Sequence, residues 1–429
     1  FLSLQPWSPD HYWNFSLTGD KDEQEYHQLA VNLLQHGTYS SDFDENISSY
    51  DFLDARRPPA YPMFLALVYF LFGISPIAAI FFQGVLSLLL PVIVYRLSGT
   101  FLNQRGALLT GILAAIEPIT VLYSFRLLPD IFFVMILMMG VRALIRATSS
   151  KTLILSGLYI GISCLFKPAA MYLLIALTPF VVWHLRKKSP FKAIFPLFTQ
   201  WTVMSFWMIR NYIIYGYFAF STIGGTNLYY YNAALTQAQE TGKSQSEVLR
   251  EWEMEPQLDQ SKNTDNPFRM AKRNQTSGLR YIAAHPLESL KTWATGLAGL
   301  FTHVGSSDAA QLLGLSPLKL EPHGSVQLMN STEVKQRIEN KNIAEKLLMA
   351  VFLVVTALIY LLAFNGVRFL DWKRFSQHVL LGLLLYFALI TGSVGNARYR
   401  LPLIPVILIL AIHGIPKKWS GDVTEFKHV

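Results

Sequence analysis

The sequence has little cysteine and little charge, and both shortages narrow the class of protein. Cys164 is the only cysteine among the 429 residues, so a disulfide within the chain is excluded and thiols say nothing about the compartment. Charged residues make up 15% of the chain, whereas a soluble domain carries roughly 25%. Hydrophobic residues make up 52%. This composition indicates a membrane protein.

Three kinds of sequence feature are also missing: a nucleic-acid-binding module, a metal-ligand spacing and a signal peptide. The net charge of +8 would suit nucleic acid, but much of it falls in short clusters between hydrophobic segments, and no nucleic-acid-binding module is present. The spacing of His27, His36 and His303 does not resemble a metal-ligand pattern. No signal peptide is found, and we expect residues 1–4 to be the outer end of a first transmembrane helix that is truncated from this chain.

Nine hydrophobic segments are candidates to cross a bilayer, which takes about 20 apolar residues. They are residues 77–97, 107–124, 128–146, 152–166, 169–185, 193–209, 345–364, 377–392 and 401–415. The sequence therefore predicts an all-α polytopic membrane protein. Two further apolar stretches, residues 61–73 and 290–304, are assigned as helices that lie in the outer interface, because counting either as a span would reverse the orientation of the later spans.

Clusters of lysine and arginine orient the predicted spans, because such clusters stay on the cytoplasmic side. Five of them alternate with the other loops, at residues 96–105, 142–151, 186–192, 368–374 and 417–418. The C-terminus is then cytoplasmic. We expect four parts: a first extracytoplasmic loop with two juxtamembrane helices, a transmembrane module, an extracytoplasmic loop or cap, and C-terminal transmembrane helices with a cytoplasmic tail. Their bounds are 1–76, 77–209, 210–344 and 345–429.

A short helix is predicted over residues 19–37 in the first outer loop. Asp22 lies where this helix should begin, and Gly37 where it should end. Its apolar side chains recur at a helical spacing that makes one stripe, formed by Tyr26, Leu29, Ala30, Leu33 and Leu34. Asp22 is either a catalytic carboxylate or only the cap of a surface helix. Asp20 competes with Asp22 for the catalytic role.

Several cations lie beside helix ends on the predicted outer side, against the usual topological bias. They are Arg56, Arg57, Lys167, Arg210, Arg398 and Arg400. As a set they predict an anionic ligand near the lipid surface, because the planar guanidinium forms paired hydrogen bonds to phosphate. Singly, each could instead reach lipid phosphates or pair with a loop carboxylate.

Two more carboxylates need an explanation. Asp130 opens a predicted span at the outer level, and it is either a second site carboxylate or an N-cap. Glu117 lies within an apolar span, where Arg126 or a water-filled cavity would have to stabilise it. Any divalent metal would have to rely on Asp22 and Asp130, so these two are the metal ligands only if a metal is used.

Six short stretches together carry a resemblance to a known family. They are Asp22 to Tyr26, Arg57 to Pro62, Tyr123 to Asp130, Lys167-Pro168 with Arg210-Asn211, and Ala397 to Pro402. In this order and on one membrane face they resemble the GT-C membrane glycosyltransferases. The most similar branch is the bacterial one near protein O-mannosyltransferases and the lipid A aminoarabinose transferase. The resemblance covers residues 19–231 and the C-terminal span, and it is weak over 235–344.

The resemblance implies a GT-C fold and a polyprenyl-phosphate-linked sugar as donor. It implies Asp22 as the catalytic carboxylate, with Asp130 as a second acidic residue. It also implies a set of substrate-binding residues, namely Arg56, Arg57, Tyr61, Lys167, Arg210, Asn211, Arg398, Tyr399 and Arg400. The acceptor would be a lipid, glycan or protein, and the enzyme would sit in a bacterial inner membrane with its site extracytoplasmic. Cofactors are not implied, apart from the divalent metal already considered.

The expected reaction is an inverting transfer in which Asp22 acts as general base on the acceptor hydroxyl. A polyprenyl-lipid transporter or flippase is the alternative, although such transporters usually contain an internal repeat and none is detectable here. Hydrolysis, with water in place of the acceptor, is a third possibility that the sequence leaves open.

Overall fold

The computed structural model describes residues 21–41, 53–147, 149–254, 266–313, 315 and 338–415. Within these ranges all regular structure is helical, as predicted. Asp20, the competitor of Asp22, lies outside the described residues.

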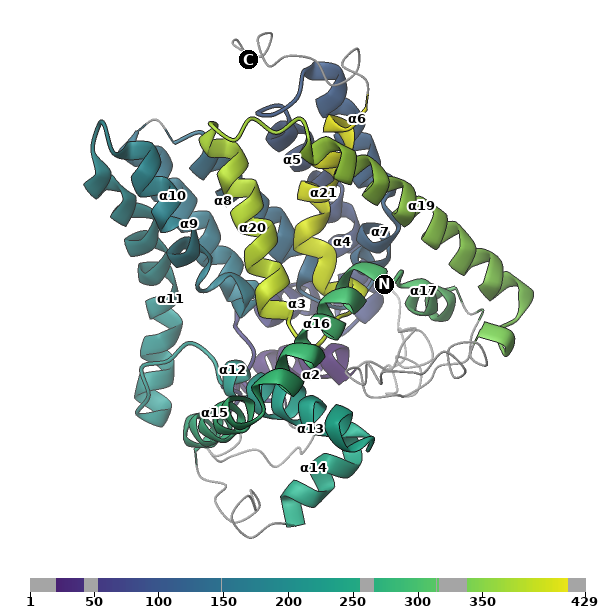
Figure 1. Cartoon of the computed structure of the whole chain (residues 1–429). Helices are drawn as coiled ribbons and strands as arrows, with labels where there is room; N and C mark the ends of the chain where they lie inside the picture. Colours follow the sequence, from purple (N-terminus) through teal and green to yellow (C-terminus); the bar gives the residue numbers. More distant parts are fainter. Residues whose placement is uncertain are drawn as a thin grey trace.

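Every one of the nine predicted hydrophobic segments is helical. The helices are α4 (Pro76–Ser87), α5 (Leu89–Ser98), α6 (Gln104–Ile116), α7 (Pro118–Ser124), α8 (Asp130–Ile145), α9 (Ser150–Phe166), α10 (Leu173–Leu185), α11 (Ile194–Tyr215), α19 (Ile343–Val367), α20 (Phe375–Thr391) and α21 (Ile404–His413). Short 3₁₀ segments lead into three of them: η2 (Pro168–Ala170), η3 (Pro190–Ala193) and η5 (Ala397–Leu403). The helices form one bundle, with the C-terminal end of α21 at its upper end in Figure 1.

Three helical segments of the described chain are long and apolar enough to cross a membrane by themselves. They are Pro76–Ser98, Pro168–Leu185 and Ile343–Val367. The pair α6 and α7 is a fourth if it counts as one span, although it bends by 53°. These apolar helices identify an integral membrane protein, and the number of nine spans stays a prediction.

The bend between α6 and α7 explains Glu117. Its carboxylate caps α7, where Oε2 accepts hydrogen bonds from the backbone N–H and the hydroxyl of Thr120, both at 2.7 Å. Pro118 follows directly and cannot donate to the helix before it. The expected partner Arg126 pairs with Glu23 instead, at 2.6 Å. Glu117 thus closes a break in the helix.

The core of the bundle includes α8 and α21, which are buried along most of their length. In α21 every residue from Ile404 to Ile412 is buried. On α8, Gly140 allows close approach of α9, because a Cβ there would lie 2.6 Å from the side chain of Ile160. Phe133 of α8 makes an edge contact with Phe387 of α20 at 6.1 Å between ring centroids.

Two helices of the predicted first outer loop pack on each other at the lower end of the bundle. They are α2 (Lys21–His36) and α3 (Ala60–Phe72), and Tyr26 meets Tyr61 edge-on at 5.1 Å. The apolar stripe predicted for α2 is confirmed, with Tyr26, Leu29 and Ala30 buried. The helix ends before Gly37, whose φ of +66° suits glycine.

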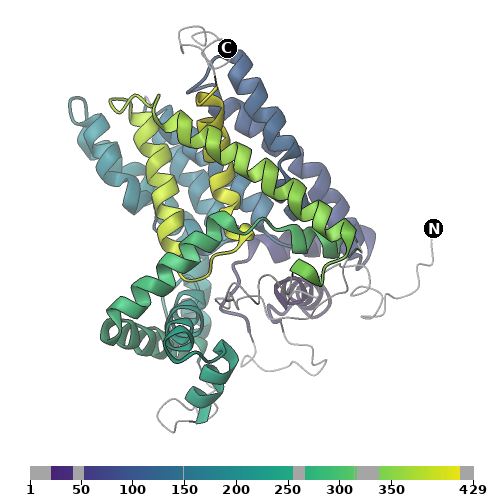
Figure 2. The same ribbon diagram turned by 45° about the vertical axis from the view of Figure 1, so that its right-hand side comes forward.

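The segment predicted as a cap consists of short helices at the same lower end (Figures 1 and 2). They are α12 (Ile223–Thr226), the π-helix η4 (Asn227–Ala233), α13 (Ala234–Thr241), α14 (Gln245–Met254), α15 (Pro267–Ala284), α16 (Pro286–Thr302) and α17 (Ser306–Leu312). A small aromatic core joins helices η4, α14 and α15 of this segment. The ring centroid of Trp252 lies 4.7 Å from that of Tyr229 and 5.7 Å from that of Tyr281. The figures show α16 slanting from this cap back across the end of the bundle.

Candidate active site

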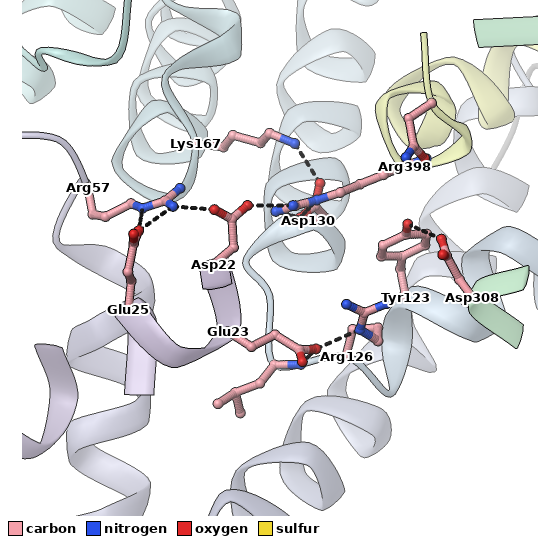
Figure 3. Close-up of polar contacts among 12 residues, drawn as sticks. Asp22, Glu23, Glu25, Arg57, Tyr123, Arg126, Asp130, Lys167, Asp308 and Arg398 are labelled. Carbon is pink, nitrogen blue, oxygen red and sulfur yellow. Dashed lines mark hydrogen bonds and ion pairs between the residues drawn. The ribbon is translucent and has the colours of Figure 1, made fainter. Parts of the chain in front are cut away.

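Asp22 lies between two guanidinium groups that come from opposite ends of the chain (Figure 3). Nη2 of Arg57 donates to Oδ1 of Asp22, and Nη1 of Arg398 donates to Oδ2 at 2.6 Å. The Asp22 side chain is 30% exposed, so it remains accessible to a ligand. Its position in the first turn of α2 also favours a negative charge, because the backbone dipole of a helix is positive at that end.

Glu25, one turn further along α2, fixes the orientation of Arg57. Its Oε2 accepts from Nε of Arg57 at 3.1 Å and from Nη2 at 2.6 Å. The guanidinium lies over the ring of Tyr26, with 4.9 Å between its central carbon and the ring centroid. Arg56 forms an ion pair with the same Glu25 carboxylate. Arg57 is therefore held on two sides while it reaches Asp22.

The loop that carries Arg57 is folded by the carboxylate of Asp54. Oδ1 of Asp54 accepts the backbone N–H groups of Arg56 and Arg57, both at 2.7 Å. The hydroxyl of Tyr39 donates to the carbonyl of Arg57 at 3.0 Å. Nη1 of Arg210 donates to the carbonyl of Asp54 at 2.9 Å. These bonds fix the backbone from which Arg57 projects.

Asp130 stands beside Asp22 as a second, deeply buried carboxylate. Lys167, at the C-terminal end of α9, donates from Nζ to Oδ1 of Asp130 at 2.6 Å. Arg398, on η5, donates from Nε to Oδ2 at 3.1 Å, and its Nη2 lies 3.0 Å from the same oxygen. Arg398 thus joins the two carboxylates through one guanidinium.

The charges around Asp22 favour an anionic guest. Among the described residues the joined groups comprise four cations, Arg56, Arg57, Lys167 and Arg398, and three carboxylates, Asp22, Glu25 and Asp130. The cluster therefore carries one positive charge in excess. A phosphate group could accept hydrogen bonds from several of these donors at once.

The same pairs set the protonation states of the groups in the cluster. Burial alone would raise the pKa of Asp22, but the charges and hydrogen bonds of Arg57 and Arg398 outweigh it and hold the pKa well below its usual range. Burial alone would lower the pKa of Arg57, and Asp22, Tyr26 and Glu25 reverse this, so its pKa is raised. Burial lowers the pKa of Lys167 despite the attraction of Asp130. Asp22 is thus ionised at neutral pH.

Buried hydrogen bonds of Glu23 and Tyr123 connect the site to the bundle. Oε1 of Glu23 accepts from Nε of Arg126 at 2.6 Å and from the backbone N–H of Leu127 at 3.1 Å. The hydroxyl of Tyr123 donates to Asp308 of α17 at 3.0 Å (Figure 3). Because Glu23 follows Asp22 directly, the Glu23 contacts tie the start of α2 to the loop that precedes Asp130.

Four of the predicted substrate-binding residues have packing contacts in this structure. Tyr61 is buried and donates to Oε1 of Gln83 at 2.8 Å. The guanidinium of Arg210 lies among the rings of Tyr39, Trp207 and Tyr215. The nearest is Trp207, with 4.7 Å between the central guanidinium carbon and the ring centroid. The remaining two bond to backbone carbonyls: Asn211 to Ala219 and Phe220, and Arg400 to Leu300 and Phe301. These contacts join the four side chains to neighbouring helices and to backbone carbonyls.

The others on the predicted list do meet at Asp22 or next to it. Arg57 and Arg398 contact Asp22 directly, Arg56 reaches Glu25, and Lys167 reaches Asp130. The ring of Tyr399 lies 5.2 Å from Nζ of Lys167.

Sequence reasoning missed two residues of this site. Glu25 is one, although its i, i+3 spacing from Asp22 would have placed both carboxylates on one helix face. Tyr231 is the other, and it comes from the π-helix η4. Burial raises the pKa of Tyr231, Asp22 adds to this effect, and Arg56 and Arg57 oppose it, so the phenol lies within electrostatic range of the site. No pattern in the sequence indicated the π-helix, a rare element that is frequent at functional sites.

The residues present do not form a ready metal site. The described part of the chain contains no group of three or more histidine, cysteine or acidic side chains that could hold a metal ion. Asp22 and Asp130, the only candidate ligands from the sequence, both direct an oxygen at the same Arg398 guanidinium. A cation between them would have to displace that side chain.

Comparison with known proteins gives one family match. Residues 56–233 match the model of a family described as dolichyl-phosphate-mannose-protein mannosyltransferase. A search of curated proteins found no match. The matched range runs from the loop carrying Arg57, through α8 and α9 with Asp130 and Lys167, to the end of η4.

Solved structures with related shapes are remote in sequence. The archaeal oligosaccharyltransferase AglB from Archaeoglobus fulgidus, in complex with an inhibitory peptide and a dolichol-phosphate, has a TM-score of 0.49 and 14% identity, over 94% of this chain and 47% of its own. ArnT from Cupriavidus metallidurans, bound to undecaprenyl phosphate, has a TM-score of 0.41 and 13% identity, over 94% of this chain and 75% of its own. The chain thus spans about half the length of AglB. The family match confirms, over residues 56–233, the predicted resemblance to GT-C membrane glycosyltransferases.

Proposed function

We propose that this protein transfers a sugar from a polyprenyl-phosphate-linked donor to an acceptor hydroxyl on the extracytoplasmic side of the membrane. The observation that carries the proposal is Asp22, a partly exposed carboxylate clamped between Arg57 and Arg398 beside the Asp130–Lys167 pair. This chemistry requires a carboxylate that takes the proton of the acceptor hydroxyl. It also requires cations that stabilise the charge on the leaving phosphate.

The donor phosphate would bind to the cations that Asp22 and Asp130 now occupy. Arg57, Arg398 and Lys167 point at these carboxylates from three separate elements (Figure 3). The description of the matched family names a dolichyl-phosphate-linked mannose, which is a donor of this kind. A lipid tail on the phosphate would lie along the exposed apolar surface of the bundle.

The reaction itself is a single displacement. The acceptor oxygen attacks the anomeric carbon and loses its proton to Asp22, while the bond from that carbon to the phosphate oxygen breaks. The phosphate leaves with both bonding electrons, and Arg57, Arg398 and Lys167 stabilise its growing charge. Attack from the face opposite the leaving group inverts the anomeric configuration. The acceptor is a hydroxyl of a lipid, a glycan or a protein.

The low pKa of Asp22 has a consequence for this mechanism. A carboxylate held well below its usual pKa is a weak proton acceptor, because Arg57 and Arg398 stabilise its ionised form. A phosphate that shares these two guanidinium groups would weaken that stabilisation and raise the pKa of Asp22. The base would then become competent when the donor is in place. Asp130 would keep Lys167 and Arg398 in position.

The test is donor-dependent transfer by the full chain in proteoliposomes, with a polyprenyl-phosphate mannose as donor. Asp22→Asn keeps the size and the hydrogen-bonding oxygen but removes the base, and we expect transfer to fall by about 10²–10⁴-fold. Asp20→Asn is the matched control and should transfer nearly normally. Donor lipid should still bind to the Asp22→Asn variant. Normal transfer by Asp22→Asn would overturn the proposal, and donor movement across the membrane without transfer would favour the flippase alternative.

A further inference from the structure

Helix α15 in the cap has a basic face opposite its buried face. The buried side is made by Phe268, Asn274 and Gly278, where a Cβ at Gly278 would lie 2.8 Å from the carbonyl of Leu228. The exposed cations recur at helical spacing on the other side, at Arg269, Lys272, Arg273 and Arg280. The helix contains no acidic residue. It therefore presents a stripe of positive charge away from the rest of the cap.

The corner where α15 turns into α16 exposes large apolar side chains next to that stripe. Leu279 is 48% exposed, Leu287 is 66% exposed and Leu290 is 59% exposed. Lys291 follows Leu290 and is exposed as well. Leucines bordered by lysine and arginine are typical of helices that lie in a lipid headgroup layer, where aliphatic parts enter the acyl region and cations remain at the phosphates.

This apolar corner is continuous with the lipid-facing surface of the bundle. Trp293 of α16 donates its indole N–H to the carbonyl of Leu389 at the outer end of α20, at 3.3 Å. There α20 exposes Leu385, Leu389 and Ile390. Tryptophan is the residue that membrane proteins concentrate at the interface. The apolar surface of α20 thus passes through Trp293 to Leu290 and Leu287 on α16.

The other end of α15 is tied to the outer end of a second bundle helix. Phe268 packs against Tyr215 and Tyr217, with ring centroids 5.6 Å and 5.8 Å apart, and Asn266 donates to the carbonyl of Tyr215 at 2.9 Å. One turn before Tyr215, α11 exposes the apolar side chains of Tyr212 and Ile213. Both α15 and α16 are therefore joined to bundle helices next to exposed apolar side chains.

We propose that the α15–α16 hairpin docks on the outer leaflet of the membrane and binds anionic phospholipid. Leu279, Leu287 and Leu290 enter the boundary between headgroups and acyl chains. The stripe of α15, together with Lys291, contacts the lipid phosphates. The charge on the stripe gives the preference for anionic lipid, and the leucines distinguish this surface from one that binds a soluble anion. The proposal is independent of the reaction proposed for Asp22.

The chain offers a direct measurement, because Cys164 is fully buried and a new surface cysteine can be labelled alone. The full chain with Leu287→Cys is labelled with an environment-sensitive fluorophore and placed in nanodiscs of phosphatidylcholine mixed with phosphatidylglycerol. We expect a blue-shifted emission that lipids brominated near the headgroup quench. Glu251→Cys, on exposed α14, is the matched control and should show water-like emission without quenching.

The charge contribution is tested by repeating the Leu287→Cys measurement with Lys272→Gln and Arg280→Gln added. These exposed substitutions should reduce quenching in nanodiscs that contain phosphatidylglycerol and leave it unchanged in phosphatidylcholine alone. Water-like, unquenched emission from the label at 287 would overturn the docking. Equal quenching with and without the two cations would overturn the preference for anionic lipid. Equal quenching at 287 and 251 would overturn the assignment to this hairpin.

Discussion

Among the contacts of the described residues, Arg398 is the side chain that binds both Asp22 and Asp130. Its Nη1 reaches Asp22, while its Nε and Nη2 reach Asp130. Two carboxylates this close would repel each other in a partly buried site, and the shared guanidinium removes that repulsion. Arg57 neutralises the other side of Asp22 and is itself balanced by Glu25. These five side chains therefore depend on one another.

Replacing Arg57 should change the pH dependence of stability. The pKa of Asp22 is lowered in the folded protein, so its stabilising contribution is complete above the unfolded value of about 3.9 and is lost as the pH falls through the folded value. Arg57→Gln removes one cation and raises that folded value. We expect the part of the acid decline of the thermal midpoint that Asp22 causes to become smaller and to end at a higher pH. The donor KM should also rise.

Arg56→Gln is the control for that measurement, because Arg56 pairs with Glu25. Its acid decline should follow that of the parent protein. Identical curves for the two variants would show that Arg57 does not set the pKa of Asp22.

Tyr231 gives a second prediction at this scale. Its phenol lies within electrostatic range of Asp22, and within the described part of the chain no hydrogen bond of its hydroxyl is found. We expect Tyr231→Phe to lower transfer about tenfold with unchanged thermal stability, because a hydroxyl that serves only the substrate contributes roughly 1.4 kcal/mol or less. Tyr230→Phe is the control. A loss of stability without a change in kcat would assign Tyr231 to packing.

At the scale of elements, glycines decide how closely α16 approaches the loop that leads to Arg398. A Cβ at Gly296 would lie 2.2 Å from the carbonyl of Gly392, and one at Gly395 would lie 1.7 Å from the carbonyl of Gly296. No side chain fits between these backbones. Arg400 strengthens the junction by donating to Leu300 at 2.9 Å. This explains why Arg400 is used in packing although it is close to Arg398 in the sequence.

Gly296→Leu should therefore separate α16 from the 392–395 loop. Overpacking of this kind typically costs about 1–3 kcal/mol, so we expect a lower thermal midpoint together with lower transfer, since Arg398 would shift. The control is Gly84→Ala, whose new Cβ would have its nearest neighbour, the ring of Phe125, at an ordinary 3.5 Å. That variant should be as stable as the parent. A stable, fully active Gly296→Leu protein would contradict the argument.

At the scale of the whole molecule, the candidate site and the cap lie at one end of the bundle and the C-terminal end of α21 at the other (Figure 1). The lysine and arginine clusters of the sequence predict that the end with the C-terminus is cytoplasmic. In this orientation Asp22 faces the extracytoplasmic side, where a lipid-linked donor would present its phosphate.

This orientation is tested by thiol labelling in intact cells with a reagent that does not cross membranes. Cysteine placed at Ser246 in the cap should be labelled, and cysteine placed at Lys187 should be labelled only after the membrane is broken. Both positions are exposed, and the native Cys164 is buried. The reverse pattern would invert the predicted topology.

Local patterns were sufficient to predict part of this protein. The spacing of Tyr26, Leu29 and Ala30 predicts the buried face of α2, because side-chain spacing along a helix is fixed by its geometry. The positions of Asp22, Arg57, Lys167 and Arg398 at helix ends on one predicted face led to four side chains that meet in the candidate site. Arg210 and Arg400 shared that sequence context, yet their partners are aromatic rings and backbone carbonyls supplied by distant segments.

The sequence by itself thus determined the helical class, the membrane composition and the apolar faces, since these follow from residue type and period. Only the tertiary structure decided which cation meets which carboxylate. Asp22 and Arg398 are separated by almost the whole chain, and their contact depends on how α2, α8, α9 and η5 converge. It also decided that η4 forms a π-helix near the site. Such contacts arise from packing between elements, which no local pattern encodes.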